Sequence, residues 1–310
     1  VNPEFSNTID TTFCLNSLPV TWNGQIINGS GSYVANLSSI NGCDSVVTLN
    51  VLINTVSAST TQTNVLCYSN ATGSIDLTVV GGTGPYVYSW NTTPVQTTED
   101  ITNLQAGNYT GTITDANGCT TSSNVTITQP ASGMVASTTQ VDVLCNGNST
   151  GSIDLTVTGG TGTYTYSWNT TPVQTTEDLT NLQAGTYLVT ITDQSNCTTT
   201  ATAVITEPTA PLSASTTQTN VLCNGNSTGS IDLTVTGGTT PYTYSWNTTP
   251  VQTTQDITNV QAGSYTATIT DANGCITTST VTITEPTAPL TASTTQTNVL
   301  CYSNATGSID

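Results

Sequence analysis

Hydrophobic and polar residues alternate along most of the chain, in short runs that turn residues separate. In residues 74–79 every second residue is Ile, Leu or Val, and in residues 86–90 every second residue is Tyr or Trp. Such alternation places the apolar side chains on one face of a β-strand. The run Asp-Ala-Asn-Gly at 115–118 is typical of a hairpin turn, since Asn and Gly tolerate positive φ. Leu-rich helical periodicity is missing, so the pattern predicts an all-β protein.

The same pattern returns every 78 residues. Cys67 and Cys145 keep this interval, as do Trp90 and Trp168, and Cys119 and Cys197. Self-similarity at a fixed period indicates a tandem array of small domains. We therefore expect a small β module that is clipped at its N-terminal end, three full repeats, and the start of a fourth copy that continues beyond the last residue. Their ranges are 1–56, 57–134, 135–212, 213–290 and 291–310.

Each repeat holds about seven short strand candidates with turn signals between them, which is the pattern of a β-sandwich. The spacing Leu-x-Ala-Gly-x-Tyr, from Leu104 to Tyr109, is typical of the tyrosine corner of immunoglobulin-like domains. We therefore predict immunoglobulin-like sandwiches, with one tryptophan and one corner tyrosine in each core. These predicted core residues are Trp90, Trp168, Trp246, Tyr109, Tyr187 and Tyr265.

Nine cysteines in a chain of this kind indicate an oxidising compartment. Two cysteines per domain at a constant separation predict one disulfide within each domain. A metal site is the weaker alternative, since the chain has neither a Cys-x-x-Cys motif nor histidine. Cys301 is then expected to pair beyond this stretch of chain. The predicted pairs are Cys14–Cys43, Cys67–Cys119, Cys145–Cys197 and Cys223–Cys275.

The chain has no lysine, arginine or histidine, and its 18 acidic residues give a net charge of −18. Nucleic acids and anionic membranes are bound through cations, so neither is an expected partner. No apolar run reaches the roughly 18 residues that cross a bilayer. Without a histidine or lysine base, and with Glu99–Asp100 and its equivalent Glu177–Asp178 the only adjacent acids, we predict no enzyme activity. Trypsin has no cleavage site in the sequence.

Calcium is the one cofactor for which the composition provides ligands, because carboxylates bind it without help from other residue types. The candidates in the first repeat are Asp76, Asp100 and Asp115. Turn capping and solubility are the alternative roles. The motif around these acids changes between copies: Glu99 becomes Gln255 in the third repeat. We therefore predict no metal site as the main interpretation. The equivalent acids are Asp154, Asp178, Asp193, Asp232, Asp256 and Asp271.

The string CNGNSTGSIDLTVTGGTTPYTYSWN, together with LQAGTY, ITDANGC and VTITEP, resembles the SprB repeat over residues 57–310. The resemblance implies a giant cell-surface adhesin of gliding Bacteroidota, exported by the type 9 secretion system. It implies an extracellular filament attached to the outer membrane, which binds surfaces, other cells or glycans and functions in attachment or gliding. Two alternatives remain open: a passive fibre, sheath or surface layer held by lateral self-association, and a carbohydrate-binding array that uses exposed aromatic residues.

Overall fold

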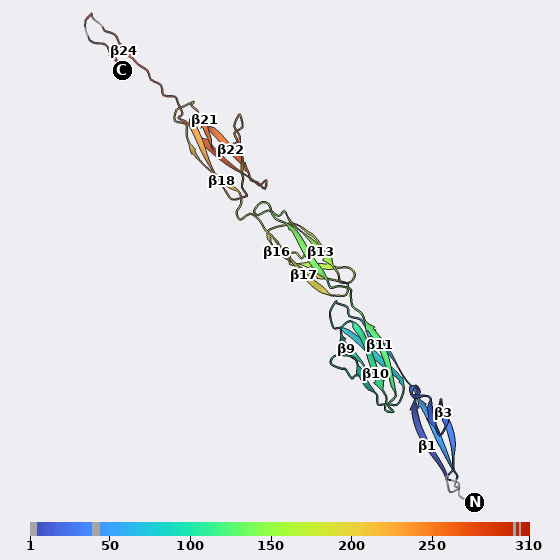
Figure 1. Ribbon diagram of the computed structural model, residues 1–310. Coiled ribbons are helices and arrows are strands. Elements are labelled where there is room, and N and C mark those ends of the chain that lie inside the picture. The colour runs from blue at the N-terminus through green and yellow to red at the C-terminus, as the bar shows by residue number, and fades with distance from the viewer. Residues whose placement is uncertain (1–4, 39–43, 300–301, 304) are drawn as a thin grey trace. The chain divides into compact units, whose positions relative to one another are not determined.

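The computed structural model describes residues 5–38, 44–299, 302–303 and 305–310. Its contacts divide the chain into two compact units, and the division passes through the second repeat. Nearly all regular structure in the described residues is β-strand, with one short 3-10 helix, η1 (Leu15–Ser17) (Figure 1). The all-β class expected from the alternation is confirmed. No helix in these ranges has the length and apolarity needed to span a membrane.

The N-terminal module is built on a three-stranded sheet of order β1-β5-β4. Strand β1 runs parallel to β5, while β4 pairs antiparallel with β5. A short hairpin, β2-β3, adds Ile27 to a small core with Leu49 and Val51. The strand bounds are β1 Phe5–Cys14, β2 Val20–Trp22, β3 Gln25–Ile27, β4 Gly31–Ser38 and β5 Asp44–Asn54.

The first repeat forms two three-stranded sheets, β6-β7-β9 and β8-β10-β11. All strand pairs within these sheets are antiparallel. The apolar side chains that alternate along the strands meet between the sheets, as in immunoglobulin-like sandwiches. The repeat has six strands where the sequence predicted about seven. They are β6 Val56–Thr63, β7 Gly73–Gly81, β8 Val87–Trp90, β9 Ile101–Leu104, β10 Gly107–Thr114 and β11 Thr120–Ile127.

The second and third repeats have the same six strands in the same order. Their sheets are β12-β13-β15 with β14-β16-β17, and β18-β19-β21 with β20-β22-β23. Two further short strands pair near the C-terminus. The bounds are β12 Val135–Val141, β13 Gly151–Thr158, β14 Thr165–Trp168, β15 Leu179–Leu182, β16 Gly185–Thr192, β17 Thr198–Ile205, β18 Ser213–Thr219, β19 Gly229–Thr236, β20 Thr243–Trp246, β21 Ile257–Val260, β22 Gly263–Thr270, β23 Ile276–Ile283, β24 Gln296–Thr297 and β25 Ser308–Ile309.

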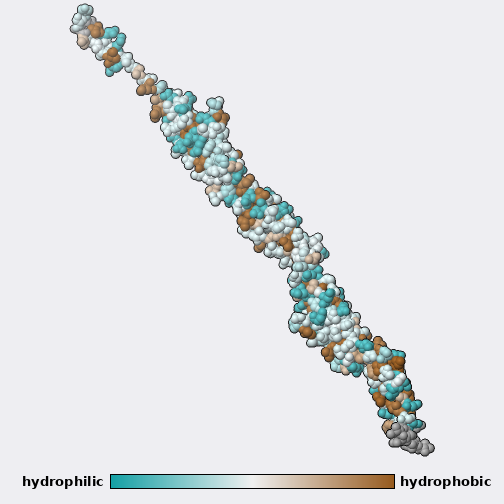
Figure 2. Space-filling model, viewed as in Figure 1, coloured by the Kyte–Doolittle hydropathy of each residue, from teal (hydrophilic) through white to brown (hydrophobic). Residues whose placement is uncertain are grey.

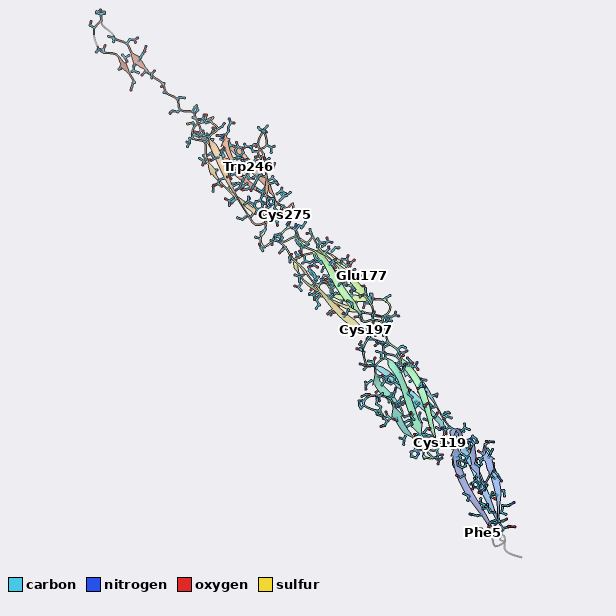
Figure 3. The ribbon with its side chains drawn as sticks, in the orientation of Figure 1. Phe5, Cys119, Glu177, Cys197, Trp246 and Cys275 are labelled. Atoms are coloured by element: carbon cyan, nitrogen blue, oxygen red, sulfur yellow. A yellow bond between two sulfur atoms is a disulfide. The ribbon has the colours of Figure 1, made fainter. Side chains whose placement is uncertain are left out.

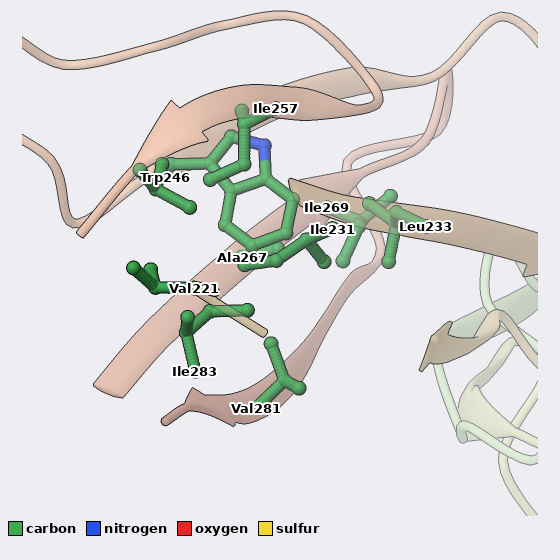
Figure 4. Packing of buried hydrophobic residues seen from close by; sticks show 10 residues of the cluster. Val221, Ile231, Leu233, Trp246, Ile257, Ala267, Ile269, Val281 and Ile283 are labelled. Carbon is green, nitrogen blue, oxygen red and sulfur yellow. The ribbon is translucent and has the colours of Figure 1, made fainter. Parts of the chain in front are cut away.

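One tryptophan fills the centre of each core. Trp90, Trp168 and Trp246 are each 1% exposed, and Figure 4 shows Trp246 among the aliphatic side chains of the third repeat. The indole N–H of Trp90 donates to the Thr98 carbonyl at 3.0 Å, so burial leaves no polar atom unpaired. Gly111 faces this ring at van der Waals contact, and a Cβ there would overlap it. The burial expected of these tryptophans is observed.

The corner tyrosines also take their expected place. Tyr109, Tyr187 and Tyr265 each donate a hydroxyl hydrogen bond of 2.9 Å to the carbonyl four residues earlier. In the first and third repeats, the rings are partly buried against the core. This is the tyrosine corner that the Leu-x-Ala-Gly-x-Tyr spacing predicts.

Polar residues occupy most of the outward strand positions. In β7, Asp76 and Thr78 are exposed while Ile75 and Leu77 between them are buried. The surface seen in Figure 2 is mostly hydrophilic or near neutral, with apolar side chains interspersed. Threonine, a strong β-former, thus occupies solvent-facing strand positions that charged residues occupy in most proteins.

Candidate functional site

The disulfides join successive domains and do not lie within them. Each bridge connects a cysteine of one domain to the cysteine before the last strand of the next domain (Figure 3). The predicted pairing within each domain is therefore wrong. Cys43 and Cys301 lie outside the described residues, and Cys223 is a free, exposed thiol. The observed pairs are Cys14–Cys119, Cys67–Cys197 and Cys145–Cys275.

The strand directions explain why Cys67 and Cys119 do not pair. Cys67 lies in the loop after β6, at the end of the sandwich where Val65 donates to the Thr128 carbonyl. Cys119 lies in the turn before β11, at the opposite end, where Gly82 donates to Thr55. The length of β7 separates these ends, roughly 25 Å at about 3.3 Å per residue. A disulfide requires Cα atoms within about 7 Å.

We name the two segments that meet at each bridge. The cysteine loops are residues 64–72, 142–150 and 220–228, each between the first two strands of a repeat. The cysteine turns are residues 115–119, 193–197 and 271–275, each between the last two strands. In the first bridge, Cys14 at the end of β1 takes the part of a cysteine loop.

A buried aspartate organises every cysteine turn. Asp115 is 4% exposed, and its Oδ1 accepts the amides of Asn117 and Cys119 at 2.9 and 2.8 Å. Its Oδ2 accepts the amide of Thr83 at 3.0 Å. Asp193 and Asp271 make the same three bonds, all at 2.9 Å. These three are the only buried polar or charged residues in the described ranges. The carboxylate thus holds the backbone conformation of the turn that contains the bridging cysteine.

The hydrogen bonds also change the acidity of these groups. Burial raises the pKa of Asp115, but the amides of Thr83, Cys119 and Asn117 and the Asn54 side chain outweigh it, so the pKa is lowered overall. In Asp271, burial is likewise outweighed by the backbone amides of the third repeat, and the pKa is lowered. Both groups are therefore carboxylates at neutral pH, the form that accepts these bonds.

In each repeat, a pair of glycines forms a close backbone contact with the segment that precedes the repeat. Gly81 and Gly82 have φ of +78° and +74°, and the Gly82 amide donates to the Thr55 carbonyl at 2.7 Å. A Cβ on Gly81 would overlap that carbonyl, so the close approach requires glycine. Gly160 and Gly238 bond in the same way to the Ser132 and Ala210 carbonyls at 3.2 and 3.0 Å. The Gly-Gly-Thr motif thereby ties the linker to the cysteine turn, a role that the sequence analysis missed.

Side chains near the bridges add contacts that differ between copies. Asn54 donates to Asp115 Oδ2 and to Cys119 Sγ in the first junction. Asn273 donates to the Leu144 carbonyl at 3.0 Å in the third junction. The second junction has Ser195 at the position of Asn273, and no comparable amide bond to the cysteine loop is present in its described residues.

The calcium candidates are not brought together. Asp115 is occupied by amide donors, Asp100 Oδ1 accepts the Leu77 amide at 3.0 Å, and Asp76 is exposed on β7. No group of three or more potential metal ligands occurs in the described residues. Asp115 therefore performs the turn capping that the sequence offered as its alternative role.

Three segments match the family model described as "SprB repeat", namely residues 59–94, 137–172 and 215–250. Each match begins in the first strand of a repeat and ends beyond its tryptophan. No curated protein sequence matches the chain.

Three multidomain arrays are among the solved structures to which the chain is similar. Immunoglobulin domains 1–5 of Sidekick-1 are 10% identical, with 90% of this chain and 79% of that chain covered and a TM-score of 0.28. A structure titled for host cell surface retention of a 1.5-MDa bacterial ice-binding adhesin is 13% identical, with coverage of 74% and 98% and a TM-score of 0.37. A tetra-tandem repeat from the extending region of a large adhesion protein is 12% identical, with coverage of 83% and 82% and a TM-score of 0.24.

Proposed function

Because the chain carries three SprB repeats, we propose that it is a section of a repetitive adhesin displayed outside the cell. The adhesin attaches cells to surfaces or to other cells, including attachment during gliding, and is anchored at the outer membrane. The observation that carries the proposal is the threefold match to the SprB repeat, on a tandem array of sandwich domains linked by disulfides. The disulfides fit an oxidising, extracellular setting.

Attachment through many weak contacts suits such an array better than a single binding pocket does. Similar repeats present closely related surfaces several times, and linked copies gain avidity without any new contact. The buried acids of the cysteine turns accept backbone amides, so they are not free to act as catalytic acids or bases. We therefore propose no enzyme activity.

The carbohydrate-binding alternative rested on exposed aromatic side chains. The three tryptophans are buried, while Tyr86 and Tyr88 pack against the core of the first repeat. The Tyr86 hydroxyl also donates to the Gly81 carbonyl at 2.6 Å. These residues offer no stacking platform for a sugar ring.

A bead assay with the full oxidised chain tests the proposal. Beads that carry the chain attached by its C-terminus are passed over glass, polystyrene and agar under flow, and their retention is measured. Control beads carry an unrelated immunoglobulin-like array of similar length and net charge. Retention at least several-fold above the control supports adhesion. Retention equal to that of the control beads on all three surfaces refutes the proposal. Lateral bundles of the free chain in electron micrographs would then support the passive fibre.

A further inference from the structure

The three disulfides enclose overlapping stretches of the chain. The loop closed by Cys14–Cys119 contains Cys67, whose own bridge reaches forward to Cys197. The loop closed by Cys67–Cys197 in turn contains Cys145. Overlap of this kind makes the array a covalent network, in which several routes of unequal length connect the two ends.

The shortest covalent route avoids most of the chain. From Cys14 it crosses to Cys119, follows the backbone to Cys145, and crosses again to Cys275. Of all the residues from 14 to 275, only 119 to 145 lie on this route. The backbone without bridges would extend to about 90 nm over this interval at about 3.5 Å per residue, whereas the bridged route allows about 10 nm.

Slightly more than half of the short route is already extended in the folded protein. Of its 27 residues, β11 and β12 contribute 8 and 7. A strand rises about 3.3 Å per residue, close to the limit of a stretched backbone. These two strands therefore have little slack to give up. The inner strands β7 to β10, with the tryptophan core, lie off the route.

We propose that the bridges between successive repeats give the array a load-bearing function: they carry tension around the sandwich cores and cap the extension of the chain. Under load, force passes through the last strand of one repeat, the first strand of the next, and the sulfur atoms. Unfolding of a core then releases almost no length. This function goes beyond the proposed attachment role and needs no ligand, so either can fail while the other stands.

The alternative is that the bridges only stabilise the folded domains. A disulfide within a domain would do that, but it would leave the linkers as the sole covalent connection between domains. Here every bridge reaches into the following domain. Each bridge thus adds a second covalent connection across a junction, which stability alone does not require.

Force spectroscopy on the full chain, held by its two ends, tests the proposal. Accessible thiols are first alkylated, and the oxidised chain is then stretched. We expect the distance between residues 14 and 275 in the stretched oxidised chain to reach its covalent limit at about 10 nm. After reduction, each repeat is expected to unfold in a separate step of about 27 nm, since 78 residues at about 3.5 Å each are released. Release of similar lengths by the oxidised and reduced chains overturns the proposal.

Two double variants with the same number of bridges sharpen the test. Cys145→Ser with Cys275→Ser removes a bridge on the short route, so the cap between residues 14 and 275 is expected to rise to about 45 nm. Cys67→Ser with Cys197→Ser removes the bridge off that route, so the cap is expected to stay near 10 nm. Equal caps in the two variants contradict the proposal. Tryptophan fluorescence of each variant before stretching shows whether its cores remain folded, and reduction of the unmutated chain provides the same comparison without substitution.

Discussion

The cysteine loops of the second and third repeats are built alike but end differently. In the second repeat, the Glu207 carboxylate accepts the Gly147 amide at 2.5 Å and Asn146 donates to the Pro208 carbonyl at 2.8 Å. In the third repeat, Glu285, Gly225, Asn224 and Pro286 make the same two bonds at 2.6 and 2.8 Å. Yet Cys145 is bridged while Cys223 is a free thiol. The shape of the loop is therefore a property of the repeat itself, and bridging depends on the cysteine turn that meets it.

Alkylation of the unreduced 310-residue chain should give the largest contrast between the two loops. We expect iodoacetamide to modify Cys223 fully, because it is exposed, and Cys145 not at all, because a disulfide has no thiolate. Mass spectrometry after pepsin digestion locates the label, since trypsin cannot cut this chain. Label on Cys145 without prior reduction would mean that the two loops do not differ.

Replacing the two cysteines should separate their contributions to stability. Cys145→Ser opens a loop of 130 residues, which the chain-entropy model values at up to about 5 kcal/mol. The matched control, Cys223→Ser, removes no bond and should leave the free energy of unfolding unchanged within about 0.5 kcal/mol. Calorimetry of both variants measures the difference. Equal destabilisation by the two substitutions would show that the bridge contributes nothing.

The cysteine turn that meets the Cys145 loop should make its junction sensitive to acid. The pKa of Asp271 is lowered in the folded state, so its contribution to stability is present above the ordinary aspartate pKa near 3.9 and is lost as the pH falls through the folded value. We expect the unfolding temperature to fall below about pH 4, and Asp271→Asn to lower it at pH 7 and flatten this dependence. Asp232→Asn, at an exposed strand position, is the control and should change neither.

Loosening the loops themselves should have the smallest effect. Glu285→Gln weakens the bond to the Gly225 amide by about 1 kcal/mol, and the Cys223 thiol should then react up to several-fold faster. Glu207→Gln makes the same change beside the bridged Cys145 and should leave that cysteine unreactive. Stopped-flow alkylation measures both rates. An unchanged alkylation rate at Cys223 would show that this hydrogen bond does not control the exposure of the thiol.

Much of the fold follows from local patterns in the sequence. The alternation in residues 74–79, the buried Trp90 and the corner Tyr109 could all be predicted, because each depends on residues close together in one repeat. The turn at 115–118 was also predicted, although its aspartate proved to be one of three buried acids in the described residues.

The disulfide pairing could not be read from spacing alone. A constant interval of 78 residues is the same whether Cys67 pairs within its own repeat or with the next one. Counting strands would not have separated the two either. The repeat has six strands, and four of them lie between the loop after β6 and the turn before β11. That the two cysteines lie at opposite ends of the sandwich follows only from how the strands pair in the structure.

The offset of each bridge by one domain also bears on how such a gene can change. No bridge needs a partner cysteine within the same repeat, because each cysteine loop pairs with the cysteine turn of the repeat that follows it. Recombination that removes or inserts a whole 78-residue unit therefore leaves every interior bridge with a partner in the correct place. The number of repeats can vary between generations without any compensating substitution, so length becomes a trait that selection can adjust freely.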